Sequence, residues 1–415
     1  MLDSCYCLSL RLMKYLRQVF IYLLLFLCGS ITAQEQVDSA AQDSVLRQIP
    51  YAERVVTRIN GLLESKLLQT SQLGLMVYDL DADSVLFAYN AKQLLRPAST
   101  MKVLTAVTAL DRLGAGHRLT TNVYHSGEKS GRVLRGALYV KGGMDPSFSE
   151  YDMHDLVSAI RQLQVDTITG ALVADRSFKD DDLYGEGWCW DDKNPVLSPL
   201  SYKRGDGFMS TLRMMLDEAG IAVLGCDSVG AVPAGATCIT QVTTELGVLM
   251  PKMMKDSDNL YAESVYYQIG ASSGRTATAK RAQQYIKQLI NNVGLKADDY
   301  RLADGSGLSL YNYVTAELEV AFLRYAYRNK RIFDTLYPSL PIAGVDGTLK
   351  KRMRGTQAEG NIHAKTGTLT GISSLAGYAL SPEKHTIAFC IINQGVLKTQ
   401  PAKDFQDAVC EALCK

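Results

Sequence analysis

The sequence predicts an α/β chain of the α+β type, in which helices and an antiparallel sheet are interrupted by an inserted β-rich domain. Strand patterns lie near both ends of the chain, and helical patterns lie between them. Residues 116–244 differ from both in being rich in short strands and turns. At 415 residues the chain also exceeds what one hydrophobic core usually organises. We therefore expect two domains, one inserted into the other.

The first 33 residues have the order of a secretory signal peptide. Basic residues precede the apolar run 19–28, and Gly29-Ser30-Ile31-Thr32-Ala33 follows it. A membrane-spanning helix needs about twenty apolar residues, which disfavours a permanent anchor. Cys28 leaves a lipoprotein open, although the residue before it is bulky, and Met13 is an alternative start. We expect residues 1–33 to be removed from an exported, periplasmic or extracytoplasmic protein.

The first part of the main domain, residues 34–115, is expected to hold two helices and two strands. Residues 34–60 run from a polar lead into an amphipathic helix, and residues 74–90 form two strands around an Asp-Ala-Asp-Ser turn. From Ser99 onward apolar residues recur at helical spacing, and Gly114 stands where a helix would end. Ser99 is therefore expected to open a buried helix.

The remaining chain is divided between the inserted domain and the second part of the main domain. The inserted domain covers 116–244, where strand-like segments alternate with turns. The second part covers 245–415 and begins with helical patterns on both sides of residues 256–258. Residues 363–393 predict three neighbouring antiparallel strands, and a last helix is expected from about Ala402 to Leu413.

Composition excludes several classes of function. The 44 Lys and Arg residues balance 43 Asp and Glu, for a net charge of +1, so no nucleic-acid partner is expected. The five histidines are scattered, and neither His-Glu-x-x-His nor Cys-x-x-Cys occurs, so we expect no metal and no other cofactor. Six of the nine cysteines follow the signal peptide, and their state stays open between disulfides, which export permits, and buried thiols.

Three short motifs occur in order and carry the predicted chemistry. They are Ser99-Thr100-Met101-Lys102, Ser257-Asp258-Asn259 and Lys365-Thr366-Gly367-Thr368. Each alone is common, because Ser-x-x-Lys arises by chance, Ser-Asp-Asn suits a helix start and Lys-Thr-Gly an ordinary strand end. Together, in this order and each on the expected element, they favour the catalytic set that beta-lactamases and penicillin-binding proteins share.

The spacing of Ser99 and Lys102 suits proton transfer. Residues i and i+3 share one helix face at about 5–6 Å between Cβ atoms, which brings the lysine amine near the hydroxyl. A free lysine has a pKa of about 10.4, so Lys102 must be kept partly neutral by burial or by a neighbouring cation such as Lys365. The alternative, a solvated helix charge, is disfavoured by its apolar neighbours. We expect Ser99 to be the nucleophile and Lys102 its base.

The other catalytic roles concern the transition state. Ser257 is expected to relay a proton toward the leaving amine, with Lys365 beside it as an electrostatic stabiliser. The backbone N–H groups of Ser99 and Thr368 are expected to hold the developing oxyanion.

The remaining motif residues are expected to bind substrate. Asn259 would bind a substrate amide, and Thr366 the terminal carboxylate. Gly367 would leave room for an extended peptide along the strand edge. Asp258 is expected to be a structural cap.

At these motifs the chain resembles the class C low-molecular-mass D-Ala-D-Ala carboxypeptidase/endopeptidases, a family of penicillin-binding serine DD-peptidases. The similar strings, which cover most of the mature chain, are RPASTMKVLTAVTAL, GGMDPS, VADRSF, GWCWDD, MMKDSDNLYAE, ADGSGLS, LPIAGVDGTLKKRM and HAKTGTLTGISSLAGY. The resemblance implies a beta-lactamase/transpeptidase-like domain, a helical cluster on an antiparallel sheet. It implies peptidoglycan stem peptides as substrates and covalent beta-lactam inhibitors, and peripheral membrane association is left open.

Two details of the resemblance concern the insertion. Ser257 follows Ser99 by 158 residues, more than is typical of beta-lactamases but fewer than in the better-known members of this family. Part of the insertion is therefore expected to be missing, with residues 203–207 marking the reduced region. From the string VADRSF the resemblance implies that Asp175 contacts the amino group of a stem-peptide diamino acid. A turn cap is the alternative for Asp175.

The predicted function is a serine-type D-Ala-D-Ala carboxypeptidase/endopeptidase that works through an acyl-enzyme at Ser99. A beta-lactamase is the first alternative, disfavoured by the long insertion and by the lack of a clear second carboxylate motif. The other is a non-catalytic peptidoglycan- or penicillin-binding module, which would be free to lose one of the motif residues that are all present here. The sequence does not separate carboxypeptidase from endopeptidase activity.

Overall fold

The computed structural model describes residues 49–189 and 194–415. The predicted signal peptide lies outside the described residues, as do residues 190–193, which include the last three residues of the GWCWDD string. Internal contacts divide the chain into two units, residues 1–58 and 59–415. In the first unit only the start of helix α2 (Tyr51–Leu63) is described. No helix within the described ranges combines the length and the apolar character needed to cross a membrane.

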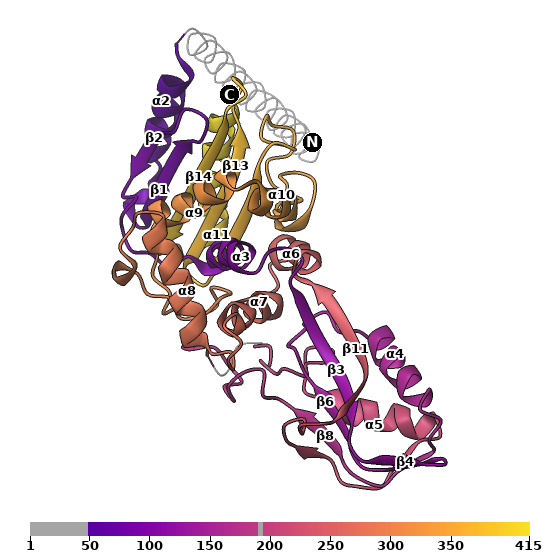
Figure 1. Ribbon diagram of the computed structural model, residues 1–415. Coiled ribbons are helices and arrows are strands. Elements are labelled where there is room, and N and C mark those ends of the chain that lie inside the picture. The colour runs from indigo at the N-terminus through magenta and orange to yellow at the C-terminus, as the bar shows by residue number, and fades with distance from the viewer. Residues whose placement is uncertain (1–48, 190–193) are drawn as a thin grey trace, which may run out of the picture. The chain divides into compact units, whose positions relative to one another are not determined.

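A five-stranded antiparallel sheet joins the two ends of the second unit (Figure 1). Its order is β12-β13-β14-β1-β2. The strands are β1 (Gln72–Asp79), β2 (Ser84–Tyr89), β12 (His363–Leu369), β13 (Ile372–Leu380) and β14 (Thr386–Gln394). Strands β13 and β14 are buried over almost their whole length instead of alternating, which indicates that both faces of the sheet are covered. Helices α9 (Ala316–Arg328) and α11 (Thr399–Cys414) pack on these strands.

A cluster of helices packs around α3 (Met101–Arg112), in which ten of the twelve residues are buried. The other members are α6 (Leu246–Lys255), α7 (Asn259–Ala271), α8 (Ala279–Asn292) and α10 (Lys330–Ser339). With α9 they form one hydrophobic core, which also takes in the face of the sheet that carries Tyr378 and Ile392. Helix α3 is thus held on all sides, and the motif residues at its start have a fixed position.

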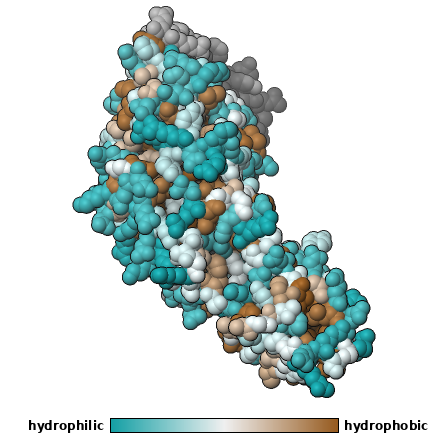
Figure 2. Space-filling view, viewed as in Figure 1, coloured by the Kyte–Doolittle hydropathy of each residue, from teal (hydrophilic) through white to brown (hydrophobic). Residues whose placement is uncertain are grey.

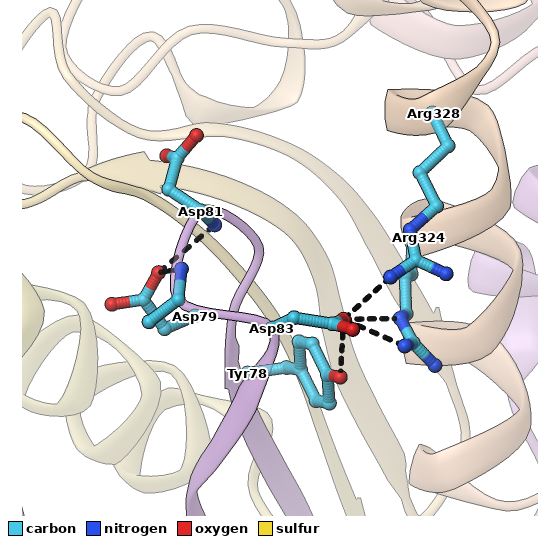
Figure 3. A network of polar contacts seen from close by, with 7 residues as sticks. Tyr78, Asp79, Asp81, Asp83, Arg324 and Arg328 are labelled. Carbon is cyan, nitrogen blue, oxygen red and sulfur yellow. Dashed lines mark hydrogen bonds and ion pairs between the residues drawn. The ribbon is translucent and has the colours of Figure 1, made fainter.

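A network of charged side chains joins α9 to the turn between β1 and β2 (Figure 3). Asp83 Oδ1 accepts a hydrogen bond from the hydroxyl of Tyr78 at 2.7 Å. It also accepts from the guanidinium groups of Arg324 and Arg328, each at 2.6 Å. The network fixes α9 against the first hairpin, and α9 carries a buried carboxylate to the site described below.

The strands between residues 118 and 245 form two sheets of their own. One has the order β10-β8-β6-β3-β11 and the other β4-β5-β7-β9. The strands are β3 (Arg118–His125), β4 (Glu128–Ser130), β5 (Val133–Arg135), β6 (Leu138–Lys141), β7 (Thr167–Ile168), β8 (Leu172–Asp175), β9 (Ala222–Val223), β10 (Ser228–Val229) and β11 (Thr237–Glu245). A separate hydrophobic core lies among them, with Leu138, Leu156 and Leu212 at full burial.

Two helices in this segment were not expected from the sequence, α4 (Glu150–Arg161) and α5 (Phe208–Glu218). Helix α4 begins with a capping box, in which Ser149 and Asp152 each accept the other's backbone N–H. Both helices have short apolar faces and lie between turn-rich segments, so the sequence pattern did not indicate them. On the side of the chain visible in Figure 2, hydrophilic residues predominate.

Candidate active site

The three motifs meet where α3 begins, α6 passes into α7, and β12 runs alongside. Ser99 lies in a 3-10 turn (Ala98–Thr100) that leads into α3, so it precedes the α-helix instead of opening it. The i to i+3 relation to Lys102 is preserved. Ala98 adopts a left-handed φ of 49°. Gly307 packs on this turn so closely that a Cβ there would lie 1.8 Å from the Ala98 carbonyl oxygen.

Lys102 is fully buried, and its amine has three hydrogen-bond acceptors. Its Nζ lies 2.9 Å from Ser99 Oγ, 2.8 Å from Asn259 Oδ1 and 2.8 Å from the Ser306 carbonyl oxygen. An ammonium group has three donors, so the charged form is fully bonded here. The neutral amine keeps two N–H donors and a lone pair that can accept the Ser99 proton.

Burial lowers the pKa of Lys102 to about 8. The negative charges of Asp304, Glu263 and Asp258 oppose this effect and keep the pKa from falling further. The sequence left two causes open, burial or a neighbouring cation, and burial is the main one. A substantial fraction of Lys102 is therefore neutral near pH 8 and can act as a base.

Lys365 is the second fully buried lysine. Its Nζ donates to Ser257 Oγ at 2.9 Å and to the carbonyl oxygen of Thr366 at 2.6 Å. Burial lowers the pKa of Lys365 well below its ordinary value; the charge of Lys102 lowers it further, and Glu319 opposes both. Ser257 has a left-handed φ of 59°, an uncommon conformation for a residue other than glycine. The site thus contains two serine–lysine pairs, one from the first motif and one shared by the second and third.

Asp258 caps helix α7, as expected from the sequence. Its Oδ1 accepts the backbone N–H groups of Leu260 and Tyr261, at 2.9 and 3.4 Å. Its Oδ2 accepts from Arg204 at 2.6 Å, so residues 203–207 reach this cap. The cap makes Asn259 the first residue of α7, with its side chain on Lys102.

Strand β12 brings the third motif to the Ser99 turn. Gly367 has no room for a side chain, because a Cβ would lie 2.1 Å from Ser374 Oγ and 2.9 Å from the Ser99 nitrogen. The missing side chain thus lets β12 pack against the Ser99 turn, and the binding of a peptide along the edge of β12 stays a prediction. Thr366 Oγ1 donates to Thr348 Oγ1 at 2.7 Å, and Thr368 is exposed at the strand edge.

Asp175 lies in the inserted segment, at the end of β8, and is buried. Its Oδ1 accepts the backbone N–H of Ser177 and its Oδ2 that of Val232, both at 2.9 Å. Burial alone would raise its pKa, but these hydrogen bonds outweigh burial and lower it. The contacts are those of a turn cap, the alternative for this residue, and no motif residue is among its partners in the described structure.

The sequence did not assign a role to the ADGSGLS loop, residues 303–309, which supplies the third acceptor for Lys102. Asp304 shapes this loop, because it accepts the backbone N–H groups of Gly307 and Ser309 at 2.8 and 2.7 Å. Glu263, on α7, accepts the backbone N–H of Ser306 at 2.8 Å. The only signal for Glu263 was its place four residues after Asn259, on the same helix face.

A second buried carboxylate, Glu319 on α9, was also missed. Thr100 Oγ1 donates to Glu319 Oε1 at 2.6 Å, which ties this carboxylate to the residue after Ser99. Cys390 Sγ donates to the other oxygen at 3.5 Å. Burial raises the pKa of Glu319 to about 7, opposed by these two donors and by Lys365.

Within residues 49–189 and 194–415 no group of His, Cys, Asp and Glu side chains is placed to hold a metal ion. The six cysteines of these ranges are free thiols. What the site offers is a hydroxyl beside a buried amine with a pKa of about 8, and a second hydroxyl on a second lysine. This arrangement suits acyl transfer to a serine, with proton exchange on both sides of the acyl carbon.

Comparison with known proteins gives one matching family model and relatives of the same description. The family model described as "D-Ala-D-Ala carboxypeptidase 3 (S13) family" matches residues 55–201 and 203–415. A D-alanyl-D-alanine carboxypeptidase from Actinomadura sp. (strain R39) is 27% identical, over 86% of this chain and 84% of the relative.

Solved structures agree in fold. The crystal structure of penicillin binding protein 4 (dacB) from Haemophilus influenzae matches with a TM-score of 0.77 at 23% identity, over 84% of this chain and 97% of that one. The same protein complexed with a beta-lactam matches with a TM-score of 0.72 at 24% identity, over 85% and 97% of the two chains. The predicted fold class is thereby confirmed.

Proposed function

Because this chain belongs to the D-Ala-D-Ala carboxypeptidase 3 (S13) family and is thus a serine DD-peptidase, as its motifs predicted, we propose that Ser99 is the nucleophile and Lys102 the base. The observation that carries the assignment is the 2.9 Å distance between Lys102 Nζ and Ser99 Oγ. Asn259 Oδ1 and the Ser306 carbonyl take the other two directions of the amine. Neutral Lys102 therefore keeps its lone pair for the serine proton.

In the acylation step Ser99 Oγ attacks the carbonyl carbon between the two D-alanines as its proton passes to Lys102 Nζ. The carbonyl oxygen becomes an oxyanion, which the backbone N–H groups of Ser99 and Thr368 hold. Ser257 then gives its hydroxyl proton to the nitrogen of the departing D-alanine and regains one from Lys365, whose Nζ lies 2.9 Å from it. The C–N bond breaks and the acyl group stays on Ser99.

Hydrolysis of the acyl-enzyme repeats these transfers with water. After D-alanine leaves, Lys102 gives up the proton that it took from Ser99 and Lys365 regains the one that it gave to Ser257, by exchange with solvent. Lys102, neutral again, takes a proton from a water molecule that attacks the ester carbon, and gives this proton to Ser99 Oγ as the C–O bond breaks, which restores the free enzyme. The buried position of both lysines supports this role, because a low dielectric strengthens their effect on the developing charge.

The substrate proposed is the D-Ala-D-Ala end of a peptidoglycan stem peptide. Asn259 offers Nδ2 to a substrate carbonyl while its Oδ1 holds Lys102. Thr366 is proposed to release Thr348 and bind the terminal carboxylate. Residues 1–33 have the pattern of an export signal, which supports a place outside the cytoplasm where peptidoglycan lies. Residues 116–244 are proposed to be the inserted domain, since among the described strands those from 118 to 245 pair only with one another.

Labelling with a fluorescent penicillin tests the nucleophile. We expect wild-type protein to carry one covalent adduct on the peptide that contains Ser99, located by mass spectrometry, and Ser99→Ala to carry none. Folded wild-type protein without label, or equal labelling of Ser99→Ala, would contradict the proposal.

A second experiment separates the two activities. Purified protein is incubated with a pentapeptide ending in D-Ala-D-Ala and, separately, with a cross-linked dimer of stem peptides. Release of free D-alanine indicates carboxypeptidase activity, and conversion of the dimer to monomers indicates endopeptidase activity. A protein labelled at Ser99 that releases no product from either substrate would refute the peptidase reaction.

A further inference from the structure

We propose that Glu263 is a positioning residue of the peptidase reaction, which acts on Lys102 through the backbone of Gly305 and Ser306. The inference rests on the proposed role of Lys102 as the base for Ser99. Glu263 is buried in α7, with 1% of its surface exposed, and the reaction steps above make no use of it. A buried carboxylate is costly to maintain unless its contacts compensate, so its contacts indicate what it does.

Both oxygens of Glu263 are bound to one short stretch of the 303–309 loop. Oε1 accepts the backbone N–H of Ser306 at 2.8 Å and that of Gly305 at 3.1 Å, and Oε2 lies 3.2 Å from the Gly305 nitrogen. The carbonyl oxygen of the same Ser306 accepts from Lys102 Nζ at 2.8 Å. Glu263 therefore fixes one residue of the loop from its N–H side, and that residue holds the lysine from its C=O side.

Helix α7 positions two of the three hydrogen-bond acceptors around Lys102. Asn259 contacts the amine directly, and Glu263, one helical turn later, does so through Ser306. With two N–H groups of the amine directed to these acceptors, the third direction is left for Ser99 Oγ. The orientation of the lone pair of neutral Lys102 thus depends on both residues of α7.

Glu263 also contributes charge. The ionisable groups around Lys102 are Glu263 from α7, Asp258 before it, Asp304 from the loop and Lys365 from β12. The negative charge of Glu263 raises the pKa of Lys102. Burial and the charge of Asp304 raise the pKa of Glu263 itself to about 8. Glu263 and Lys102 thus titrate over the same pH range. Where Glu263 is ionised its charge favours the charged form of Lys102, so removal of Glu263 lowers the pH at which Lys102 becomes a base.

A matched variant exists on the other side of the loop. Thr105, three residues after Lys102 on α3, donates from Oγ1 to the carbonyl oxygen of Gly305 at 2.7 Å. Thr105→Val removes this tether with little change of shape and no change of charge. It separates the mechanical contribution of the loop from the electrostatic contribution of Glu263.

The experiment measures the rate of acylation by a fluorescent penicillin from pH 6 to 10 for wild type, Glu263→Gln, Glu263→Asp and Thr105→Val. Glu263→Gln keeps the shape but loses the charge, so we expect the pH midpoint of its acylation rate to fall, by at most about one unit because Glu263 is only partly ionised near pH 8. Glu263→Asp keeps the charge but withdraws from Ser306, so we expect a loss of about tenfold in rate at every pH. For Thr105→Val we expect a lower acylation rate without a shift of its pH midpoint.

A folded Glu263→Gln with the rate and midpoint of wild type overturns the proposal, and so does an equal midpoint shift in Thr105→Val. If Glu263→Gln does not fold, Glu263→Asp decides, and wild-type acylation by that variant overturns the proposal. A failure of the proposed function is recognised separately, because wild type itself would then take no label at Ser99.

Discussion

Gly367 and Ser99 are packed so closely that a Cβ added to Gly367 would lie 2.9 Å from the backbone nitrogen of Ser99. It would also lie 2.7 Å from the Pro97 carbonyl oxygen. Because backbone atoms cannot move aside as a flexible side chain can, an alanine here must displace the nucleophile or the strand. We expect Gly367→Ala to lower penicillin acylation by about 100-fold.

The control for this prediction is Gly116→Ala. A Cβ at Gly116 has no heavy atom within 4 Å, and its φ is not in the left-handed region. Stopped-flow acylation of both variants and of wild type, with thermal unfolding to verify that each is folded, gives the comparison. Near wild-type acylation by Gly367→Ala would show that the turn tolerates displacement.

The motifs could be predicted from the sequence because each depends on local geometry. Ser99 and Lys102 are one helical turn apart, Asp258 caps the helix that follows it, and Lys365 lies on a strand with a strong pattern. The two strands at residues 74–90 and the three from 363 to 393 were predicted for the same reason.

The groups that the sequence missed act over long separations. The Ser306 acceptor is a backbone carbonyl, which no side-chain pattern can indicate, and it lies 204 residues from Lys102. Glu263 and Glu319 look like ordinary helix surface residues, and only the tertiary contacts reveal that both are buried. The close packing at Gly367 was not predicted because the Ser374 side chain beside it comes from another strand.

Acylation by wild-type enzyme is expected to depend on pH through Lys102. Only the neutral amine accepts the Ser99 proton, and burial lowers the pKa of Lys102 to about 8. The rate should therefore rise with pH and level off above about 8, instead of rising toward the ordinary lysine pKa of about 10.4. Stopped-flow acylation between pH 6 and 10 measures it, with circular dichroism at each pH as the control for folding. A rate independent of pH would exclude Lys102 as the base.

Glu319 is expected to make folding stability depend on pH. Its pKa is raised from 4.5 to about 7 by burial, so the folded state binds more protons than the unfolded state between these values. The contribution of Glu319 to folding stability is fully present below pH 4.5 and is lost as pH rises through 7. Relative to Glu319→Gln, whose side chain stays neutral, the free energy of unfolding of wild type should fall by up to about 3 kcal/mol over this pH range.

Urea unfolding of wild type and Glu319→Gln at pH 5 and pH 8 tests this prediction. The glutamine retains an acceptor for Thr100, so the comparison isolates the charge. We expect the free energy of unfolding of Glu319→Gln to increase relative to that of wild type as pH rises. A constant difference between the two proteins at pH 5 and 8 would mean that Glu319 does not titrate in this range.

Asp175 allows the two roles considered for it to be separated. As a turn cap its carboxylate satisfies the backbone N–H groups of Ser177 and Val232, and Asp175→Ala would leave both without an acceptor in a buried position. We expect this to lower the free energy of unfolding by about 1–3 kcal/mol while acylation by penicillin, which carries no diamino acid, is unchanged. The substrate role predicts something else, a raised KM for stem peptides with a free amino group and an unchanged KM for the same peptides after acetylation. Asp175→Asn, which keeps one acceptor, decides between the two roles when its KM is measured on both peptides. Equal changes of KM for the free and the acetylated peptide would exclude the substrate role, so that Asp175 would act as a turn cap alone.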